Sequence, residues 1–180
     1  MAQEHISALK KMALCRTLSG AELDAIAAIV QAKQFAAGGE LFREGDPGDG
    51  LYLVAAGEVE VLKRGPAGEH SLAKLGEGGV LGEMSLVTSD ARSATGRAIA
   101  PTTVLHLPVR EFRALLDSGS TAALRIAAAI AEVLARRLAT MNGMVLELTG
   151  KSGPSAAATR SPLKTQDLRE MHRVLQVWSF

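Results

Sequence analysis

Hydrophobic and polar positions change their period along the chain. Between residues 6 and 32 the apolar residues recur at helical spacing, and Ser19 precedes Glu22 by three positions, the spacing of a helix capping box. This pattern predicts N-terminal helices, one of which begins at Ser19 and runs through Val30. From Phe35 onward, short apolar runs alternate with Gly-rich turns, which predicts β-strands joined by hairpins.

The clearest strand signal lies in the middle of the chain, where Val59 and Val61 alternate with charged neighbours. We predict that residues 51–54 form the strand that pairs with it. A last strand is predicted at residues 103–107, which stand between two prolines, because proline cannot donate to a β-ladder. The fold class that follows is mainly β with flanking helices: a double-stranded β-helix (jelly-roll) barrel followed by a long C-terminal helix.

That long helix is predicted at residues 121–148. A first apolar stripe has heptad-like spacing and consists of Leu124, Ala127, Ala131, Leu134, Leu138, Met141, Val145 and Leu148. A second stripe on a neighbouring face consists of Ile126, Ile130 and Val133. We expect one stripe to pack on the barrel and the other on a second copy, giving a homodimer through 121–148. The alternative is that both stripes are buried within one monomer.

The chain divides into three parts by composition. Residues 1–148 form one domain, with the N-terminal helices, the barrel and the dimer helix. Residues 149–162 are small, polar and rich in Pro and Gly, which predicts a flexible linker. Residues 163–180 form an amphipathic C-terminal segment that needs a partner surface, so a protein partner is expected there.

Composition excludes several classes of function. A formal net charge of +1 gives no broad attraction to nucleic acid or to a membrane surface. Cys15 is the single cysteine and can form neither an intramolecular disulfide nor a multi-cysteine metal site, which favours a reducing, cytoplasmic location. No segment reaches the roughly 18 apolar residues of a membrane span, and the N-terminus lacks a signal-peptide pattern.

Catalytic motifs are also missing from the sequence. The four histidines are scattered without metal-ligand spacing, and there is neither a nucleophile elbow nor a pair of carboxylates that frames a site. We therefore expect a protein that is not an enzyme, with no metal and no cofactor.

The segment LGEMSLVTSDARSATGRA, residues 81–98, has the chemistry of an anion cradle. Gly82 allows close approach of the backbone, and residues 83–87 can form a short helical turn whose N–H groups point toward a phosphate. Arg92 can donate to two phosphate oxygens at once, while Ser93 adds a hydroxyl beside its amide.

Glu83 is suited to a different task in this segment. A carboxylate is a poor neighbour for phosphate but a good acceptor for a ribose hydroxyl, so the sugar and the phosphate would be recognised separately. The alternative interpretation is that Glu83 and Arg92 simply pair across the loop and that the glycines serve only turns.

These residues carry a resemblance to a known family. GEMSL, a short spacer and RSAT resemble the phosphate-binding cassette of the cyclic-nucleotide-binding domain family, which includes catabolite-activator-like bacterial regulators. Upstream, FREGDPGDGLYLVAAGEVEV resembles that family's hairpin signature, and LARRLA resembles its dimer helix. The resemblance covers roughly residues 18–148. Ser85, where the family usually has Ala or Gly, and Ala91, where Pro is common, are departures expected to contribute backbone more than side chain.

The resemblance implies a ligand and a set of contacts. The ligand would be a cyclic nucleotide, with Glu83 on the ribose 2′-hydroxyl and Arg92 on the cyclic phosphate. Amides complete the shell, and the candidate cassette residues are therefore Gly82, Glu83, Met84, Ser85, Arg92, Ser93 and Ala94.

The base is less well defined by the sequence. Thr140 and Asn142 lie near the helix region that contacts the base in activator-like members, and both can bind an adenine edge, although solvent-facing polar positions are an equal alternative. By the resemblance, Ser93 occupies a position where a hydroxyl can favour guanine in some family members, yet serine also occurs there in cAMP-binding bacterial members. Of the two nucleotides, we expect cAMP as the ligand.

The expected function is a sensor module in which nucleotide binding repacks the dimer helix. The alternatives are a Crp/Fnr-like transcription regulator with a truncated or absent DNA-binding domain, and a dimerisation module that does not bind nucleotide. DNA is not expected as a partner, because the 31 residues after Thr149 are fewer than the roughly 45 that a helix-turn-helix domain needs.

Overall fold

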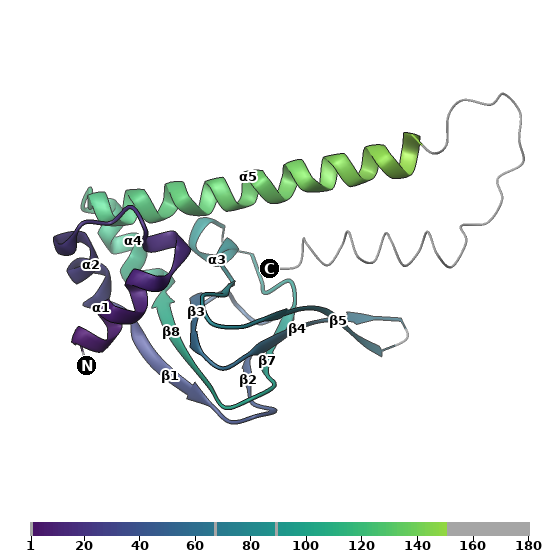
Figure 1. The fold of residues 1–180 in the computed structure, drawn as a ribbon, viewed down its shortest axis with the longest axis horizontal. Helices are drawn as coiled ribbons and strands as arrows, with labels where there is room; N and C mark the ends of the chain where they lie inside the picture. The colour runs from purple at the N-terminus through teal and green to yellow at the C-terminus, as the bar shows by residue number, and fades with distance from the viewer. Residues whose placement is uncertain (1, 67, 89, 151–180) are drawn as a thin grey trace, which may run out of the picture.

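The computed structural model describes residues 2–66, 68–88 and 90–150 (Figure 1). Helices precede, interrupt and follow the strands; they are α1 (Ala2–Lys11), the 3₁₀ helix η1 (Ala13–Cys15), α2 (Gly20–Ala27), α3 (Met84–Val87), α4 (Val109–Asp117) and α5 (Thr121–Gly150). The strands are β1 (Gln31–Phe35), β2 (Glu40–Phe42), β3 (Gly50–Ala56), β4 (Val59–Gly65), β5 (Gly68–Leu75), β6 (Val80–Leu81), β7 (Thr95–Ala98) and β8 (Thr102–Pro108).

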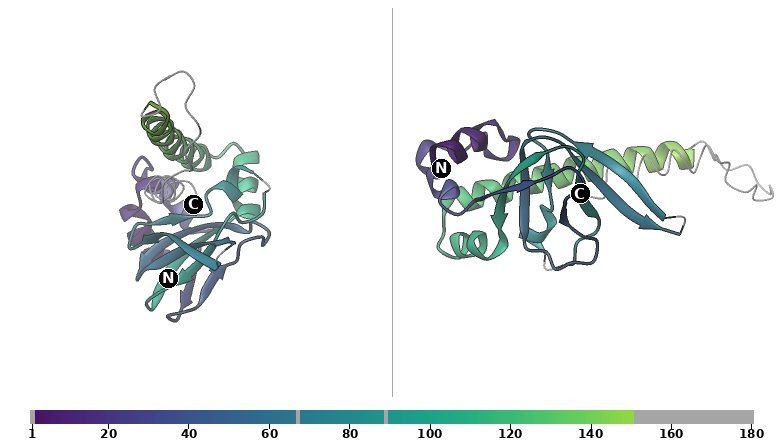
Figure 2. Two further views of the ribbon diagram at one scale, coloured as in Figure 1. Left: turned by 90° about the vertical axis from the view of Figure 1, so that its right-hand side faces the viewer. Right: turned by 90° about the horizontal axis from the view of Figure 1, so that it is seen from below.

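The strands form two four-stranded antiparallel sheets, in the orders β1-β8-β3-β6 and β2-β7-β4-β5. The helices gather at one end of this barrel, and α5 extends along it (Figures 1 and 2). The predicted fold class, a jelly-roll barrel with flanking helices and a long C-terminal helix, is confirmed.

Strands β3 and β8 separate two hydrophobic clusters because their side chains alternate between the two faces of the sheet. Leu53 and Leu105 are register partners and belong to the cluster that includes the helices. Tyr52 and His106 are partners one position along, and Tyr52 belongs to the cluster inside the barrel. The barrel interior is therefore lined by alternate residues of a strand that carries helices on its other side.

One predicted strand pairing is wrong. Residues 51–54 do not pair with the strand at Val59; β3 pairs with β6 and β8, whereas β4 pairs with β5 and β7. The first five residues of β3 are all buried, which fits a strand covered on both faces, and its chain crosses to the other sheet instead of turning back. Among the described strands, β4 and β5 are the neighbours in sequence that form a hairpin.

The N-terminal boundary also differs from the prediction. The capping box exists, because the Glu22 amide donates to Ser19 Oγ and the Ser19 amide donates to the Glu22 carboxylate at 2.7 Å. However, α2 ends at Ala27, and β1 begins at Gln31, before the predicted start of the β region. Pairing with β8 overrides the helical spacing of these residues.

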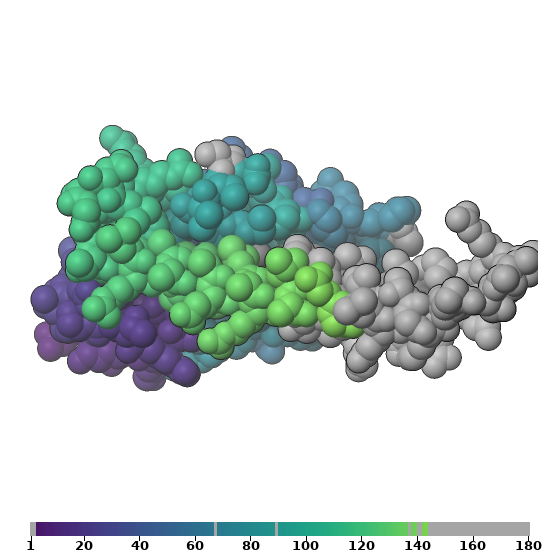
Figure 3. Space-filling model, turned by 90° about the horizontal axis from the view of Figure 1, so that it is seen from above, coloured from purple at the N-terminus to yellow at the C-terminus, as the bar shows by residue number. Residues whose placement is uncertain are grey.

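Helix α5 buries one of its two predicted stripes. Ile126 and Ile130 are fully buried beside the N-terminal helices, whereas Leu124 and Leu138 are exposed. Arg125 forms an ion pair with Glu22 at 3.0 Å, which also fixes α5 to the N-terminal region. Figure 3 shows α5 lying along one open face of the molecule.

The helix continues to Gly150, so the first two residues of the predicted linker are helical. The rest of that linker and the predicted amphipathic segment at 163–180 lie outside the described residues. Among the described helices, none alone is long and apolar enough to cross a membrane; α4 and the first part of α5 meet that criterion only as a pair bent by 116°.

Candidate functional site

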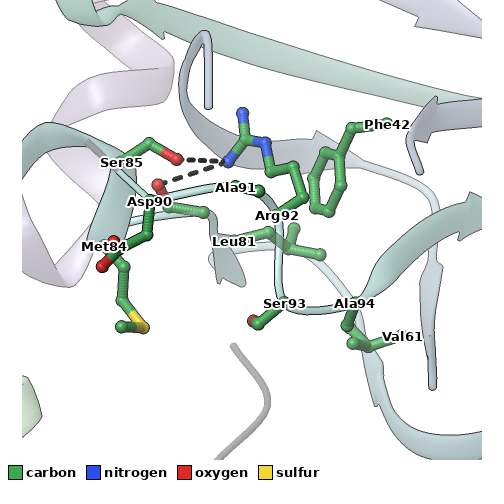
Figure 4. A pocket seen from close by; sticks show the side chains of 11 residues that line it. Phe42, Val61, Leu81, Met84, Ser85, Asp90, Ala91, Arg92, Ser93 and Ala94 are labelled. Carbon is green, nitrogen blue, oxygen red and sulfur yellow. Dashed lines mark hydrogen bonds between the residues drawn. The ribbon is translucent and has the colours of Figure 1, made fainter. Parts of the chain in front are cut away.

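The structure brings most of the predicted cassette around one pocket of about 270 Å³, close to the lower limit of the roughly 300 Å³ usual for ligand sites (Figure 4). Its walls come from β2, β4, the β6–α3 junction and the loop before β7. The lining residues are Phe42, Val61, Leu81, Gly82, Met84, Ser85, Asp90, Ala91, Arg92, Ser93 and Ala94. Glu83, between two lining residues, is buried with 1% of its surface exposed.

The first turn of the cassette depends on Gly82. Its φ of +70° is in the left-handed region, and a Cβ there would lie 1.9 Å from Arg92 Nη1. The short helix α3 follows, and the Ser85 amide donates to the Gly82 carbonyl at 3.1 Å. The predicted helical turn is therefore present, and the glycine brings its backbone against the arginine side chain.

The backbone of Arg92 is held by the loop between β2 and β3. The Arg92 amide donates to the Asp46 carbonyl at 2.8 Å, and the Arg92 carbonyl accepts from the Gly45 amide at 2.9 Å. An antiparallel bridge between Pro47 and Ala91 extends this pairing by one position. The GDPGDG segment thus holds the main chain of the cassette as well as connecting β2 in one sheet to β3 in the other.

The Arg92 side chain is 2% exposed and points toward Ser85, passing the Phe42 ring (Figure 4). Nη1 donates to Ser85 Oγ at 3.0 Å, and Nη2 donates to the Gly50 carbonyl at 2.6 Å. Nη2 also forms an ion pair with Asp49 Oδ1. The buried Nε–H has no hydrogen-bond partner among the described residues. One donor of this buried cation is therefore unpaired among the described residues.

Two features of this arrangement differ from the prediction. Ser85 was expected to contribute its backbone, yet its hydroxyl accepts a hydrogen bond from Arg92, because Gly48 leaves room where a Cβ would lie 2.4 Å from Ser85 Oγ. The ion pair of Arg92 with Asp49 was not predicted. Both groups hold the guanidinium in place.

A second cation lies beside the cassette. Lys63 Nζ on β4 donates to the Ser93 carbonyl at 2.6 Å and to Glu44 at 2.9 Å. A hydrogen bond from the Arg64 amide and the ion pair with Lys63 lower the pKa of Glu44, so that carboxylate stays charged. Lys63 therefore ties the loop at Ser93 to the adjacent sheet, while Ser93 itself remains exposed.

The residues proposed for the base are not brought to this pocket by the described part of the chain. Asn142 is exposed on α5 and is not among the lining residues; the side chain of Thr140 lies outside what the structure describes. The site residues that sequence reasoning missed are Phe42, Asp49 and Tyr52. All three lie inside the upstream hairpin signature, but nothing in its spacing marks them as residues of the site.

Comparison with known proteins agrees with this geometry. The family model described as "Cyclic nucleotide-binding domain" matches residues 32–118, a range that includes every residue lining the pocket. The chain belongs to the cyclic-nucleotide-binding domain family. The matched range also contains the whole candidate cassette and the upstream segment from Phe42 to Val61.

Three relatives illustrate the match. The cyclic AMP receptor protein of Thermus thermophilus is 36% identical over 72% of this chain and 59% of its own length. The N-terminal domain of a Streptomyces coelicolor transcriptional regulator is 32% identical, with a TM-score of 0.64 over 76% of this chain and 95% of that one. A cyclic nucleotide-binding domain from Methylobacillus flagellatus is 26% identical, with a TM-score of 0.68 over 87% and 86% of the two chains.

These cyclic-nucleotide-binding relatives include receptors and transcriptional regulators. This chain spans about three fifths of the length of the Thermus receptor, so it corresponds to a part of that protein. It is a regulatory domain of the cyclic-nucleotide-binding family.

Proposed function

We propose that this domain is a sensor that binds cAMP in the cassette pocket and is not itself an enzyme. The observation that carries the proposal is the buried Arg92 guanidinium, which lines the pocket and keeps an unpartnered Nε–H. A buried cation with a free donor favours an anionic ligand, because a charge-assisted hydrogen bond forms where no water competes.

The remaining cassette groups supply complementary contacts. In this proposal the amides of the turn from Gly82 to Ser85, with those of Ser93 and Ala94, surround the cyclic phosphate. Glu83 accepts from the ribose 2′-hydroxyl, which separates the recognition of sugar from that of phosphate. The apolar side chains of Val61 and Leu81 line the same pocket.

The choice of cAMP is supported by relatives and by α5. The Thermus relative is a cyclic AMP receptor protein, and Thr140 and Asn142 on α5 have hydrogen-bonding groups suited to adenine. Because Asn142 is exposed in this structure, contact with the base requires that α5 or a second copy of it moves toward the pocket.

A hydrogen bond connects Asp49, which binds Arg92, to the start of α4. Asp49 binds Arg92 through its side chain and accepts the Val109 amide through its carbonyl at 3.0 Å. Val109 begins α4, which packs against α5. A phosphate that draws Arg92 away from Asp49 therefore acts on the first residue of the helical region.

Nucleotide binding tests this proposal directly. We expect calorimetric titration with cAMP to give a saturable one-site curve, with cGMP binding more weakly and cyclic dinucleotides not binding. Sedimentation of the same samples reports the oligomeric state with and without ligand. A flat cAMP titration would leave a dimerisation module that does not bind nucleotide, and specific retardation of DNA would point to a transcription regulator.

The homodimer is proposed to form through the exposed stripe of α5. Leu138 is 46% exposed on this helix, and burying it against a second copy would contribute roughly 1–2 kcal/mol per side chain. We expect Leu138→Asp to shift the protein toward monomers in analytical ultracentrifugation. Val87→Asp, which places the same charge at an exposed apolar position of α3, is the matched control and leaves the assembly unchanged. Equal sedimentation of both variants would argue against this interface.

A further inference from the structure

Asp49, Tyr52 and His106 form a polar cluster next to Arg92. The Tyr52 hydroxyl donates to Asp49 Oδ2 at 2.9 Å, and His106 Nε2 lies 3.4 Å from the same oxygen. The other oxygen, Oδ1, forms the ion pair with Arg92. One carboxylate therefore joins the phosphate-binding cation on one side to an imidazole on the other.

His106 is built into the barrel wall. It lies on β8 directly opposite Tyr52, the two ring centroids are 4.5 Å apart, and only 5% of its side chain is exposed. Gly50 provides the space for it, since a Cβ at that position would lie 2.7 Å from His106 Nε2. Both ring nitrogens are buried without a hydrogen-bond partner among the described residues, although Nε2 lies within 3.4 Å of Asp49 Oδ2. The ring is thus held in place while neither nitrogen is committed to a backbone group.

The pKa values of Asp49 and Tyr52 define the charge around the imidazole. Burial raises the pKa of Asp49, but contacts with His106, Arg92 and Tyr52 outweigh it and hold that pKa well below the usual range. Burial, together with the negative charge of Asp49, raises the pKa of the Tyr52 hydroxyl, which therefore stays neutral. Asp49 and Arg92 are both charged at neutral pH, so their charges cancel.

A further charged group close to the Tyr52 ring comes from β1. Lys33 Nζ lies 5.4 Å from the centroid of the Tyr52 ring, and a lysine keeps its positive charge across the neutral range. Arg92 also lies over the Tyr52 ring, at 5.4 Å. Asp49 therefore stays ionised and Tyr52 neutral between pH 6 and 8, whereas an imidazole is the kind of side chain whose charge can change in that range.

We propose that His106 is a positioning residue that acts on Arg92 through Asp49 and makes nucleotide affinity depend on pH. The inference rests on the proposed function of the cassette. When His106 is neutral, Asp49 attracts Arg92 without a competing cation. When His106 is protonated, it shares that carboxylate, and Arg92 meets the phosphate with its charge less compensated.

The sign of the effect follows from linkage. A cyclic phosphodiester carries one negative charge throughout the neutral range, so its own charge does not change. Its binding favours the protonated imidazole, and affinity must then rise as pH falls. We expect cAMP to bind roughly five- to tenfold more tightly at pH 6.0 than at pH 8.0, as expected for one added unit charge acting over several ångströms in a partly polar medium.

The experiment compares cAMP calorimetry from pH 6.0 to 8.0 for the whole chain and for His106→Gln, which cannot be protonated. Titration in two buffers of different ionisation enthalpy counts the protons taken up. The wild-type protein is expected to take up a fraction of a proton on binding, whereas H106Q takes up none and has a flat profile. His5→Gln on α1, the matched control, keeps the wild-type slope and proton uptake.

The outcomes separate this inference from the proposed function. Absence of cAMP binding to the wild-type protein at every pH would remove both. Binding with the same pH slope in H106Q and in the wild type would leave the function intact and overturn the role of His106. Should H106Q fail to fold, NMR of the wild-type imidazole decides: its titration midpoint moves to higher pH with saturating cAMP, and an unmoved midpoint contradicts the proposal.

Discussion

Replacing Arg92 with alanine is expected to weaken cAMP binding by roughly 100-fold, corresponding to about 3 kcal/mol for removing one partner of a desolvated charge pair. The guanidinium is buried, and Ser85, Gly50 and Asp49 hold it before the ligand arrives. Little ordering entropy therefore opposes the contact with phosphate. Arg92→Lys keeps the charge but loses the planar fork, so its affinity should fall between those of R92A and the wild type.

Isothermal titration calorimetry measures this loss, and a melting curve checks that R92A folds. The Asp49 side chain is 49% exposed, so water can solvate it once its partner is gone and the fold should survive. Arg97→Ala is the matched control. Arg97 forms ion pairs with Glu40 and Glu69 outside the pocket lining, and its loss should leave affinity within about twofold. Wild-type affinity in R92A would exclude the cassette as the binding site.

The cassette could be predicted from the sequence because its parts are close together along the chain. Gly82 and Arg92 lie within one short segment. A glycine that permits a tight turn, a helical turn with free N–H groups and a nearby arginine can each be recognised from neighbouring residues. The capping box at Ser19 and Glu22 was predicted correctly for the same reason, since its two hydrogen bonds span three residues.

Contacts between distant residues could not be predicted in this way. Asp49 lies 43 positions before Arg92, and nothing in the spacing of the GDPGDG turn distinguishes an aspartate that pairs with an arginine from one that serves the turn. His106 was counted as one of four scattered histidines, because its role arises from the register that sets it opposite Tyr52.

The prediction of which strands pair was wrong for a related reason. Alternation identifies β3 and β4 as strands, but it does not say whether successive strands share a sheet. In a jelly roll the chain crosses between sheets, so β3 pairs with β8, which begins almost fifty residues later. The helix boundary after α2 likewise depended on whether β8 was available to pair with β1.

Gly50→Ala is expected to lower the free energy of unfolding by about 3–5 kcal/mol, from overpacking and backbone strain together. An added Cβ would lie 2.3 Å from the Leu107 carbonyl and 2.9 Å from Pro108 Cα, and these backbone atoms are fixed by the β3–β8 ladder. The φ of +155° also lies where side chains are rarely accommodated. For a domain of this size the melting temperature should fall by roughly 10 °C or more, measured by differential scanning calorimetry.

Gly45→Ala tests whether this loss comes from the close approach of the backbone. Gly45 has a φ of +88°, but no atom lies within 4 Å of an added Cβ, so only strain of about 1 kcal/mol is expected. G50A should also weaken cAMP binding, because the Gly50 carbonyl accepts from Arg92 and its displacement moves the guanidinium. If G50A and G45A melt at the same temperature, the close approach of the β3 and β8 backbones at Gly50 does not contribute to stability as proposed.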